Sequence, residues 1–413
     1  MKILSLTSYF YPEKFASSHL SNDYYDSFAK AGFNIIIYTP YPTRGVDNKE
    51  REVYKTKYKH EILYDNKLSI NRFALFREGQ NHLIRAFRYF IGCVIEFFYG
   101  CKSKDADLMF ITSTPPIQGA MAVLIKKITG IPIVYNLQDI FPDSLIGTGL
   151  AKKNGILWKV GRIIENFTYR NVDKIIVISQ NFKYNLIEKG VPEEKIEVIY
   201  NWVDENAVVN IDRKNNLLFE RYELDLNKFY ITYCGNIGLT QNMDMLLEVA
   251  QELSSEKNIQ FVLVGEGVYK KEVERIIKDR SITNVILLPF QPYEEISHVF
   301  SLGNIGLVIS KPGVGENSVP SKTWSIMSAE RPVIANFDEN ELKIIIENNR
   351  CGIFTKAGDK NAFKQAILTL YHDKEKGIEM GKNGRKFILQ NLTKEIGTNN
   401  YVQVIKSFDK NNK

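Results

Sequence analysis

Short apolar runs alternate with longer amphipathic runs along this chain, and this alternation constrains the fold more than any other feature. The first series begins KILSLTSYF, HLSNDYYDSFAKAG, FNIIIYTP, in which the helical pattern ends at Gly32. Glycine commonly terminates helices, and strands buried on both faces of a parallel sheet are continuously apolar. Further strands are predicted at DLMFITS, PIVYNLQ and KIIVISQ. The pattern therefore predicts a doubly wound α/β domain.

The alternation weakens over residues 204–227, which are rich in Asn and charged side chains, and starts again at FYITYCGN. A chain of 413 residues is also too long for one hydrophobic core, since single cores stop growing near about 250–300 residues. We expect an α/β protein of two facing Rossmann-like domains with parallel sheets and a cleft between them. The expected domains are residues 1–205 and 206–394, and a C-terminal helix, residues 395–413, should pack back on the first domain.

Charge and cysteine content favour a cytoplasmic enzyme. The net charge of +6 comes from the first 200 residues, which suits an anionic partner such as a phosphate-bearing lipid, a membrane surface or a nucleic acid. The four cysteines form no C-x-x-C pair and have no His at metal-ligand spacing, so neither a zinc site nor a disulfide framework is indicated. The N-terminal apolar run ends at Pro12 and is too short for a signal peptide, so a first strand is expected there.

Residues 82–101, HLIRAFRYFIGCVIEFFYGC, are the nearest approach to a membrane-spanning segment. Arg85, Arg88 and Glu96 interrupt the apolar run, so it cannot span a bilayer as a simple helix. Two interpretations remain open. The segment is an amphipathic helix at a membrane interface, or it is a buried helix of a large α/β domain.

Ligands of open parallel sheets bind beyond the carboxyl ends of the strands, so polar groups in the loops that lead from strands into helices are the candidate contacts. The loop from Ser310 to Lys322 passes through two glycines and enters a helix around TWSIMSAE. Backbone N–H groups, the helix dipole, the Ser321 hydroxyl and the Lys322 ammonium could converge there on a diphosphate. An ordinary glycine-rich connection, with Ser321 as the N-cap of the helix, explains the same residues equally well.

Two further loops of the second domain carry candidate contacts. Gly235 permits a tight turn and close backbone approach to a ligand, and Asn236 could then bridge two bound substrates, although such loops are often only loops. Glu266 lies between two glycines, but a lone G-x-G is a weak dinucleotide signal that turn geometry also explains.

The first domain offers one carboxylate in a promising position. Asp139 directly follows an apolar strand, where it could bind an acceptor hydroxyl, or could cap a helix before Pro142, a role for which Asp143 competes. Asp105-Ala106-Asp107 matches the D-x-D pattern of some metal sites, but it precedes its strand and is expected to be a solvated turn. His19 is the only His on a loop expected to face the cleft, and the five His show no metal-ligand spacing.

Taken together, these motifs resemble the glycosyltransferase family 4 enzymes of the GT-B fold, in particular bacterial transferases of capsule, O-antigen and exopolysaccharide synthesis. The resemblance spans nearly the whole chain, and the order and spacing of its blocks make it specific. The blocks are YFYPE, TPYPTRG, TSTPP, QDIFPDS and YNWVD in the first domain, and YCGNIGLTQNMDMLLEVA, FVLVGEG, LPFQPYEEI, GENSVPSKTWSIM and RPVIANFDENEL in the second.

The resemblance implies a retaining hexosyl- or N-acetylhexosaminyltransferase that uses a UDP- or GDP-sugar as co-substrate and needs no metal or other cofactor. The donor would bind the second domain and the acceptor the first, and the leaving diphosphate would be stabilised by basic side chains and backbone N–H groups. The implied donor-binding residues are Gly235, Asn236, Glu266, Phe290, Gln291, Asn317, Ser321, Lys322 and Ser325; the catalytic ones are Asp139, Glu316 and Lys322; Ser17, His19, Gln138 and Asp139 lie on the acceptor side.

This chain departs from the family pattern at several of these positions. Many members have Arg and Lys where it has Asn236 and Gln241, and Glu where it has Ser325. Lys322 is the best local substitute for the missing positive charge, and Gln138 takes the place of a His that is common in the first domain.

The resemblance, together with the segment of residues 82–101, suggests an undecaprenyl-diphosphate-linked sugar as acceptor and a peripheral location on the inner face of the cytoplasmic membrane. Nucleic acid is not expected as a partner, because the positive surplus is small and no basic stripe with interleaved aromatics is present. Two alternatives remain open. One is a GT-B sugar-nucleotide epimerase, which would need acid–base carboxylates and His in the cleft, and the other is a non-catalytic nucleotide-sugar-binding subunit.

Overall fold

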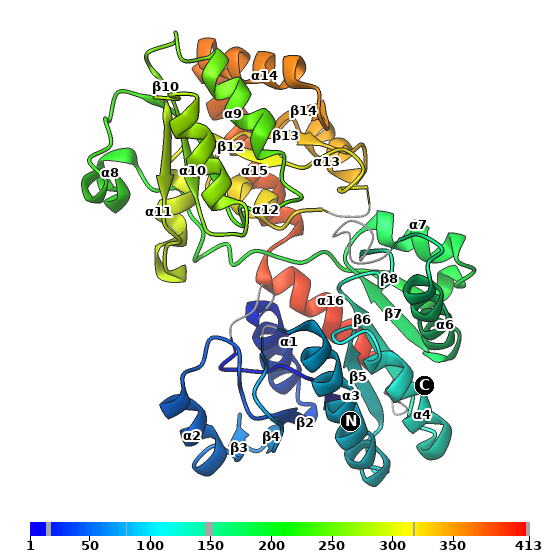
Figure 1. The fold of residues 1–413 in the computed structure, drawn as a ribbon. Helices are drawn as coiled ribbons and strands as arrows, with labels where there is room; N and C mark the ends of the chain where they lie inside the picture. The colour runs from blue at the N-terminus through cyan, green and yellow to red at the C-terminus, as the bar shows by residue number, and fades with distance from the viewer. Residues whose placement is uncertain (14–17, 80, 145–151, 317–318, 410–413) are drawn as a thin grey trace. The chain divides into compact units, whose positions relative to one another are not determined.

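The computed structural model describes residues 1–13, 18–79, 81–144, 152–316 and 319–409. The chain forms two compact units, one made of Met1–Tyr200 with Glu395–Lys413 and the other of Asn201–Lys394. Each unit contains its own sheet, parallel or mostly parallel, with helices packed against it (Figure 1). The segment 204–227, predicted to be the crossing between domains, therefore belongs to the second unit.

The first unit is built on an eight-stranded sheet with the order β3-β4-β2-β1-β5-β6-β7-β8. Every neighbouring pair is parallel except β3 and β4, which form an antiparallel hairpin at the edge. The strands are β1 (Lys2–Leu6), β2 (Asn34–Pro40), β3 (His60–Leu63), β4 (Leu68–Phe73), β5 (Leu108–Thr112), β6 (Ile133–Leu137), β7 (Lys174–Val177) and β8 (Ile196–Val198). The five apolar runs predicted as strands in this unit are present as β1, β2, β5, β6 and β7.

Helices cover the strands of this first sheet and complete its core. They are α1 (Ser18–Lys30), α2 (Asn48–Thr56), α3 (His82–Lys102), α4 (Gln118–Thr129), α6 (Ile156–Asn171), α7 (Gln180–Glu188), the short η1 (Glu193–Lys195) and α16 (Lys394–Lys406). On α16, the buried Tyr401 stacks on Tyr24 with ring centroids 5.5 Å apart, and its hydroxyl bonds Asn136 Oδ1 at 3.0 Å. The C-terminal helix is thus part of the first unit's core.

The second unit has six parallel strands in the order β11-β10-β9-β12-β13-β14. These are β9 (Phe229–Cys234), β10 (Ile259–Val264), β11 (Val285–Leu288), β12 (Ile305–Ile309), β13 (Val333–Phe337) and β14 (Gly352–Lys356). The chain winds outward from β9 to β11 and then returns to place β12 beside β9. The loops after β9 and β12 therefore leave the sheet at its topological switch point, where parallel sheets bind ligands.

The helices of the second unit pack on both faces of this sheet around a core of aliphatic and aromatic side chains that includes Ile231, Phe261 and Leu307. They are η2 (Arg213–Asn215), α8 (Leu217–Arg221), α9 (Met243–Glu252), α10 (Lys270–Asp279), η3 (Tyr293–Glu295), α11 (Ile296–Ser301), α12 (Lys322–Ser328), α13 (Glu341–Asn348), α14 (Lys360–His372) and α15 (Lys374–Asn391).

Candidate functional site

Lys322 is the cation at the switch point of the second unit. It is the first residue of α12, and its Nζ donates a hydrogen bond of 2.8 Å to the hydroxyl of Tyr233, the ring centroid of which lies 3.9 Å away. The Tyr233 hydroxyl in turn donates to the backbone carbonyl of Asn236 at 2.6 Å. Tyr233 therefore connects the ammonium to the loop that follows β9.

The Lys322 ammonium is held in a poorly solvated position. Burial lowers the pKa of Lys322 to about 8, with a smaller opposing influence from Cys234. Within the described part of the chain, no carboxylate forms an ion pair with this ammonium. A desolvated cation without a counter-ion is energetically costly, so an anion bound beside it would recover part of that cost.

Two glycines bring the neighbouring loops close to this ammonium. Gly235 has φ +135°, and a Cβ placed on it would lie 3.2 Å from Lys322 Nζ. Gly265 has φ +152°, and a Cβ there would lie 2.0 Å from the carbonyl oxygen of Gly235, closer than any side chain permits. Both residues adopt backbone conformations that favour glycine. The two glycines therefore allow the loops after β9 and β10 to pack closely on each other and on the Lys322 side chain, and Asn236 beside them is exposed.

The loop after β12 differs from the expectation that its backbone N–H groups are free for a diphosphate. The N–H groups of Gly313 and Gly315 donate to the carboxylate of Asp338 at 2.9 and 2.7 Å, and the N–H of Lys311 donates to Thr240. The carboxylate of Asp338, which follows β13, already occupies the position of an anion on this turn. The expectation was wrong for these groups because a residue from another loop satisfies them.

Ser321 does not act as the N-cap that the alternative interpretation required. It has helical dihedral angles, φ −58° and ψ −26°, and its side chain accepts no capping hydrogen bond. The helix that follows, α12, has only seven residues. Its dipole is therefore a smaller contribution than the Lys322 ammonium itself.

The other predicted donor contacts lie in the loops that follow strands of the same sheet, or on the helix α12. Ser325 lies one turn after Lys322 on α12 and is half-buried. Phe290 is 71% exposed in the loop after β11. Glu266 is exposed, and its carboxylate forms an ion pair of 2.6 Å with Lys270. Glu316 is exposed, whereas Asn317 lies outside the described residues.

Gln291 is a correction to the predicted donor site. It is buried, its Oε1 accepts from Arg221 at 3.0 Å, and its Nε2 donates to the Tyr222 hydroxyl at 2.8 Å and the Pro289 carbonyl at 2.7 Å. These bonds hold the segment around α8 against the loop after β11. A ligand could use this amide only by breaking bonds that the fold requires.

In the first unit, Asp139 follows β6 as predicted. The residue is exposed, yet the surroundings of its carboxyl group remove enough solvent to raise its pKa, while hydrogen bonds with Ser144 and the Ile140 N–H oppose the rise. Gln138 beside it is fixed by an N–H bond to Ser113 Oγ at 3.1 Å. Asp143, the competing helix cap, instead bonds Trp158 and Lys189 at 3.1 and 2.7 Å.

The remaining predicted positions are placed as follows. His19 is the second residue of α1 and is half-buried, whereas Ser17 lies outside the described residues. Asp107 accepts a 2.7 Å bond from the N–H of Lys2, at the edge of the sheet where β1 and β5 begin, so the D-x-D pattern is the surface turn that was expected. Within the described ranges, no three or more His, Cys, Asp or Glu side chains converge as metal ligands would.

Tyr233 and Asp338 belong to the site but were not singled out in the sequence. Asp338 directly follows a buried strand, at the same sheet edge as the predicted loops, and this position was a usable signal. Tyr233 lies within β9, where an aromatic residue is expected to be core. Only its hydrogen bond with Lys322, which the sequence does not reveal, makes its hydroxyl part of the site.

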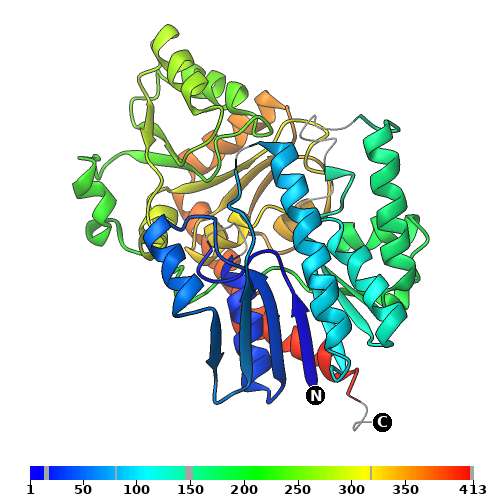
Figure 2. The same ribbon diagram turned by 60° about the horizontal axis from the view of Figure 1, so that its bottom comes forward.

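The helix α3, light blue in Figure 2, has the reverse of the usual surface pattern. Its charged Arg88 and Glu96 are fully buried, while Leu83 is 81% exposed. Exposed apolar side chains continue from Leu83 at helical spacing through Phe87, Phe90, Val94 and Phe98. The interpretation of this segment as a buried apolar helix is therefore wrong for that face. Among the described residues, no helix has the length and apolarity to cross a bilayer.

Comparison with known proteins now gives the family. Residues 23–207 match the model of Glycosyltransferase Family 4, and residues 214–387 match the model of Glycosyl transferases group 1. Over 208 residues the chain is 31% identical to WcaI of Escherichia coli (strain K12), a protein named as a glycosyl transferase of colanic acid biosynthesis. That match covers 50% of this chain and 51% of WcaI, so the chain spans about half the length of this curated relative.

Two solved structures share the fold at low sequence identity. Sucrose-phosphate synthase from Thermosynechococcus elongatus superposes with a TM-score of 0.78 at 14% identity, over 98% of both chains. HepE of Anabaena, solved in complex with UDP and glucose, superposes with a TM-score of 0.73 at 15% identity, over 98% of this chain and all of HepE. The fold is therefore GT-B, and the chain belongs to the family 4 glycosyltransferases.

Proposed function

We propose that this chain transfers a sugar, with retention of configuration, from a nucleotide-sugar to a saccharide acceptor in cell-surface polysaccharide synthesis. The main support is the position of the Lys322 ammonium at the switch point of the second sheet. The group is desolvated, is held by Tyr233 and lies next to Gly235. A diphosphate suits this position because it supplies the missing negative charge at the switch point of the sheet. The UDP present in the HepE structure supports this choice of ligand class.

In this proposal the bond between the sugar and the diphosphate breaks while the acceptor hydroxyl bonds the same carbon. The hydroxyl proton passes to an oxygen of the departing diphosphate, and Lys322 stabilises the charge that develops there. Glu316 and Ser325 are the further donor-side candidates, and Asp139 with Gln138 would bind the acceptor. We expect no metal requirement, because a cation of the chain itself serves the leaving group.

We further propose that the acceptor is lipid-linked and that the first unit docks peripherally on the inner face of the cytoplasmic membrane. The exposed apolar stripe of α3 supports this, and α4 packs between α3 and α6. On α6, Ile156 is 85% exposed, and its neighbours Leu157, Val160 and Ile163 are also exposed. Exposed Lys152, Lys153 and Lys159 lie beside this second apolar surface, as expected for contact with anionic lipid.

A thermal-shift measurement tests the donor site. UDP or GDP should raise the melting temperature of the wild type, because a ligand that binds only the folded state stabilises it. Lys322→Met should abolish that shift, whereas Lys278→Met, at an exposed position of α10, should retain it. An equal shift in wild type and Lys322→Met would exclude the proposed diphosphate position.

Product analysis separates the proposed activity from its two alternatives. Incubation with UDP- and GDP-sugars and an acceptor should give transferred sugar, with hydrolysis of the donor as a side reaction. An epimerised nucleotide-sugar would identify an epimerase instead. Binding without any turnover, across acceptors, would identify a non-catalytic subunit.

A further inference from the structure

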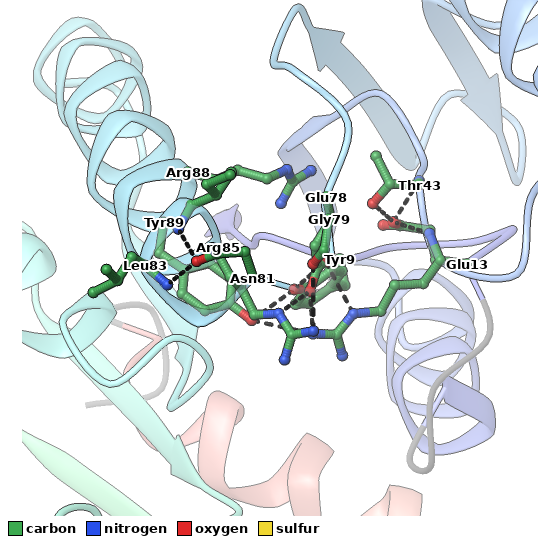
Figure 3. A network of polar contacts seen from close by, with 12 residues as sticks. Tyr9, Glu13, Thr43, Glu78, Gly79, Asn81, Leu83, Arg85, Arg88 and Tyr89 are labelled. Atoms are coloured by element: carbon green, nitrogen blue, oxygen red, sulfur yellow. Dashed lines mark hydrogen bonds and ion pairs between the residues drawn. The ribbon is translucent and has the colours of Figure 1, made fainter.

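A group of arginines in the first unit forms a second cationic site, separate in sequence from the residues around Lys322. It lies at the carboxyl ends of β1, β2 and β4 and in the first turns of α3 (Figure 3). Tyr9 follows β1, Arg44 follows β2 and Glu78 follows β4, while Arg85 and Tyr89 come from α3. This is the sheet edge at which parallel α/β sheets bind ligands.

Two guanidinium groups share one carboxylate at this site. Glu78 accepts from Arg44 Nε at 3.0 Å and Nη2 at 2.8 Å, and Arg85 Nε lies 2.8 Å from the same carboxylate. The Tyr9 hydroxyl donates to Glu78 at 2.7 Å. The pair of arginines therefore keeps one uncompensated positive charge within this group.

The open side of the site carries the arginines rather than the carboxylate. The side chains of Arg44 and Arg85 are each 33% exposed, whereas that of Glu78 is 6% exposed. No described residue accepts a hydrogen bond from Nη1 of Arg44 or Nη1 of Arg85. Two guanidinium groups thus retain N–H donors on a solvent-accessible side.

A third arginine, Arg88, belongs to the same group of side chains (Figure 3). Arg88 is fully buried; its Nε donates to the Phe76 carbonyl at 3.0 Å, while its buried Nη1 and Nη2 have no hydrogen-bond partner among the described residues. The nearby carboxylate of Glu13 is already occupied by the N–H and hydroxyl of Thr43, at 2.7 and 3.0 Å, and by the Arg44 N–H at 3.0 Å. These donors are neutral, so the charge of Glu13 remains and acts on Arg88. The uncompensated charge of the site is therefore that of the Arg44 and Arg85 pair.

We infer that Arg44 and Arg85, held in place by Glu78, bind a phosphate group of the acceptor. Guanidinium groups present planar forks of donors that match phosphate oxygens, and two that share a single carboxylate keep one positive charge and free N–H donors for a second anion. Leu83, which in Figure 3 points away from Glu78, begins the exposed apolar stripe of α3. A lipid diphosphate would therefore meet a cationic site and an apolar helix face in succession. This inference rests on the proposed function for the identity of the acceptor, but the binding itself can be measured alone.

Calorimetric titration of the full chain with inorganic pyrophosphate tests the site. Wild type should bind two equivalents of pyrophosphate. Arg44→Gln/Arg85→Gln should lose one of these equivalents or bind it at least about tenfold more weakly. Lys322→Met should lose the other equivalent. Arg170→Gln, an exposed arginine of α6, is the matched control and should bind as wild type. Unchanged binding by Arg44→Gln/Arg85→Gln would overturn the inference, whereas unchanged binding by Lys322→Met would overturn only the proposed donor site.

If Arg44→Gln/Arg85→Gln does not fold, as judged by circular dichroism, Arg44→Lys/Arg85→Lys replaces it. That variant keeps both charges and should still bind more weakly, because an ammonium cannot make the bidentate contact. Binding equal to wild type by this variant would overturn the inference.

Flotation with vesicles identifies the source of the phosphate. Phosphatidylcholine vesicles that carry a prenyl diphosphate should bind wild type more tightly than the arginine variant, which assigns the site to the acceptor. If the arginine variant loses as much binding to phosphatidylglycerol vesicles, the site is assigned to membrane headgroups instead. Undiminished binding of the variant to both kinds of vesicle would overturn a lipid source.

Discussion

The hydroxyl of Tyr233 accepts a hydrogen bond from Lys322 and donates one to the Asn236 carbonyl, so one aromatic side chain positions both the cation and the loop of the candidate donor site. The ring also faces the ammonium at 3.9 Å, which partly replaces the water that burial removes. The site is thereby preorganised around a cation that no described carboxylate neutralises.

Tyr233→Phe should weaken nucleotide binding about three- to tenfold while the protein remains folded. The substitution keeps the ring and removes only the hydroxyl, which costs about 1 kcal/mol for a typical hydrogen bond. Calorimetric titration with UDP measures the effect. Tyr184→Phe, at an exposed position of α7, should change nothing, and an equal loss in both variants would refute a positioning role for Tyr233.

Nucleotide affinity should fall as the pH rises above about 8. The pKa of Lys322 is lowered to about 8 by burial, so the free protein loses the positive charge above that pH, and with it the attraction for a diphosphate. Lys322→Arg should bind with little pH dependence from pH 7 to 9, because guanidinium stays protonated. A flat profile in the wild type would show that Lys322 does not contact the phosphates.

Gly265→Ala should destabilise the second unit by more than about 2 kcal/mol. The new Cβ would lie 2.0 Å from the Gly235 carbonyl at φ +152°, so backbone as well as side chain must shift. Gly377→Ala on α15, where a Cβ meets only Pro332 Cγ at 3.8 Å, is the control and should be neutral or slightly stabilising. Thermal melting of the two variants at one pH gives the comparison.

Glu96→Gln should remove a pH-dependent loss of stability. Burial raises the pKa of Glu96 from 4.5 to about 8, with the Gln118 hydrogen bond and the charge of Arg88 acting the other way. Since the folded pKa is the higher one, the contribution of this group is most favourable below pH 4.5 and declines as the pH rises toward 8.

We therefore compare the melting temperature of the wild type with that of Glu96→Gln at each pH. The difference, wild type minus variant, should be about 3 °C or more lower at pH 8 than at pH 5. Glu375→Gln, at the exposed start of α15, is the control for removal of one carboxylate. A difference between wild type and Glu96→Gln that does not change with pH would contradict the shifted pKa.

Phe87→Ser/Phe90→Ser should reduce binding to anionic vesicles several-fold without lowering the melting temperature. Both side chains are exposed on α3, so the folded protein loses no core contact, whereas an apolar face for lipid is removed. Ile344→Ser/Ile378→Ser removes two exposed apolar side chains from the second unit and should leave vesicle binding unchanged. Equal flotation of wild type and the phenylalanine variant would argue against docking through α3.

The β–α alternation, the strands and the loops at their carboxyl ends could all be predicted from the order of residues. Strands such as β11 and β12 are continuous apolar runs, and helices end at residues such as Gly32, so these signals lie within a few neighbouring positions. The hairpin of β3 and β4 was not predicted. The edge strand β3 is largely exposed, so it lacks the continuous apolar run that marks a buried strand.

The partners of the charged groups depend on which strands lie side by side, and no local pattern encodes that order. Asp338 reaches Gly313 because β13 pairs with β12, and Glu78 meets Arg44 because β4 pairs with β2. The same holds for α3, where Arg88 and Glu96 look like solvent-facing charges but are buried against other segments of the first unit. Local periodicity is set by covalent neighbours, whereas the pairing of distant polar groups is set by packing, and that is why the loops of this site could be anticipated but their contacts could not.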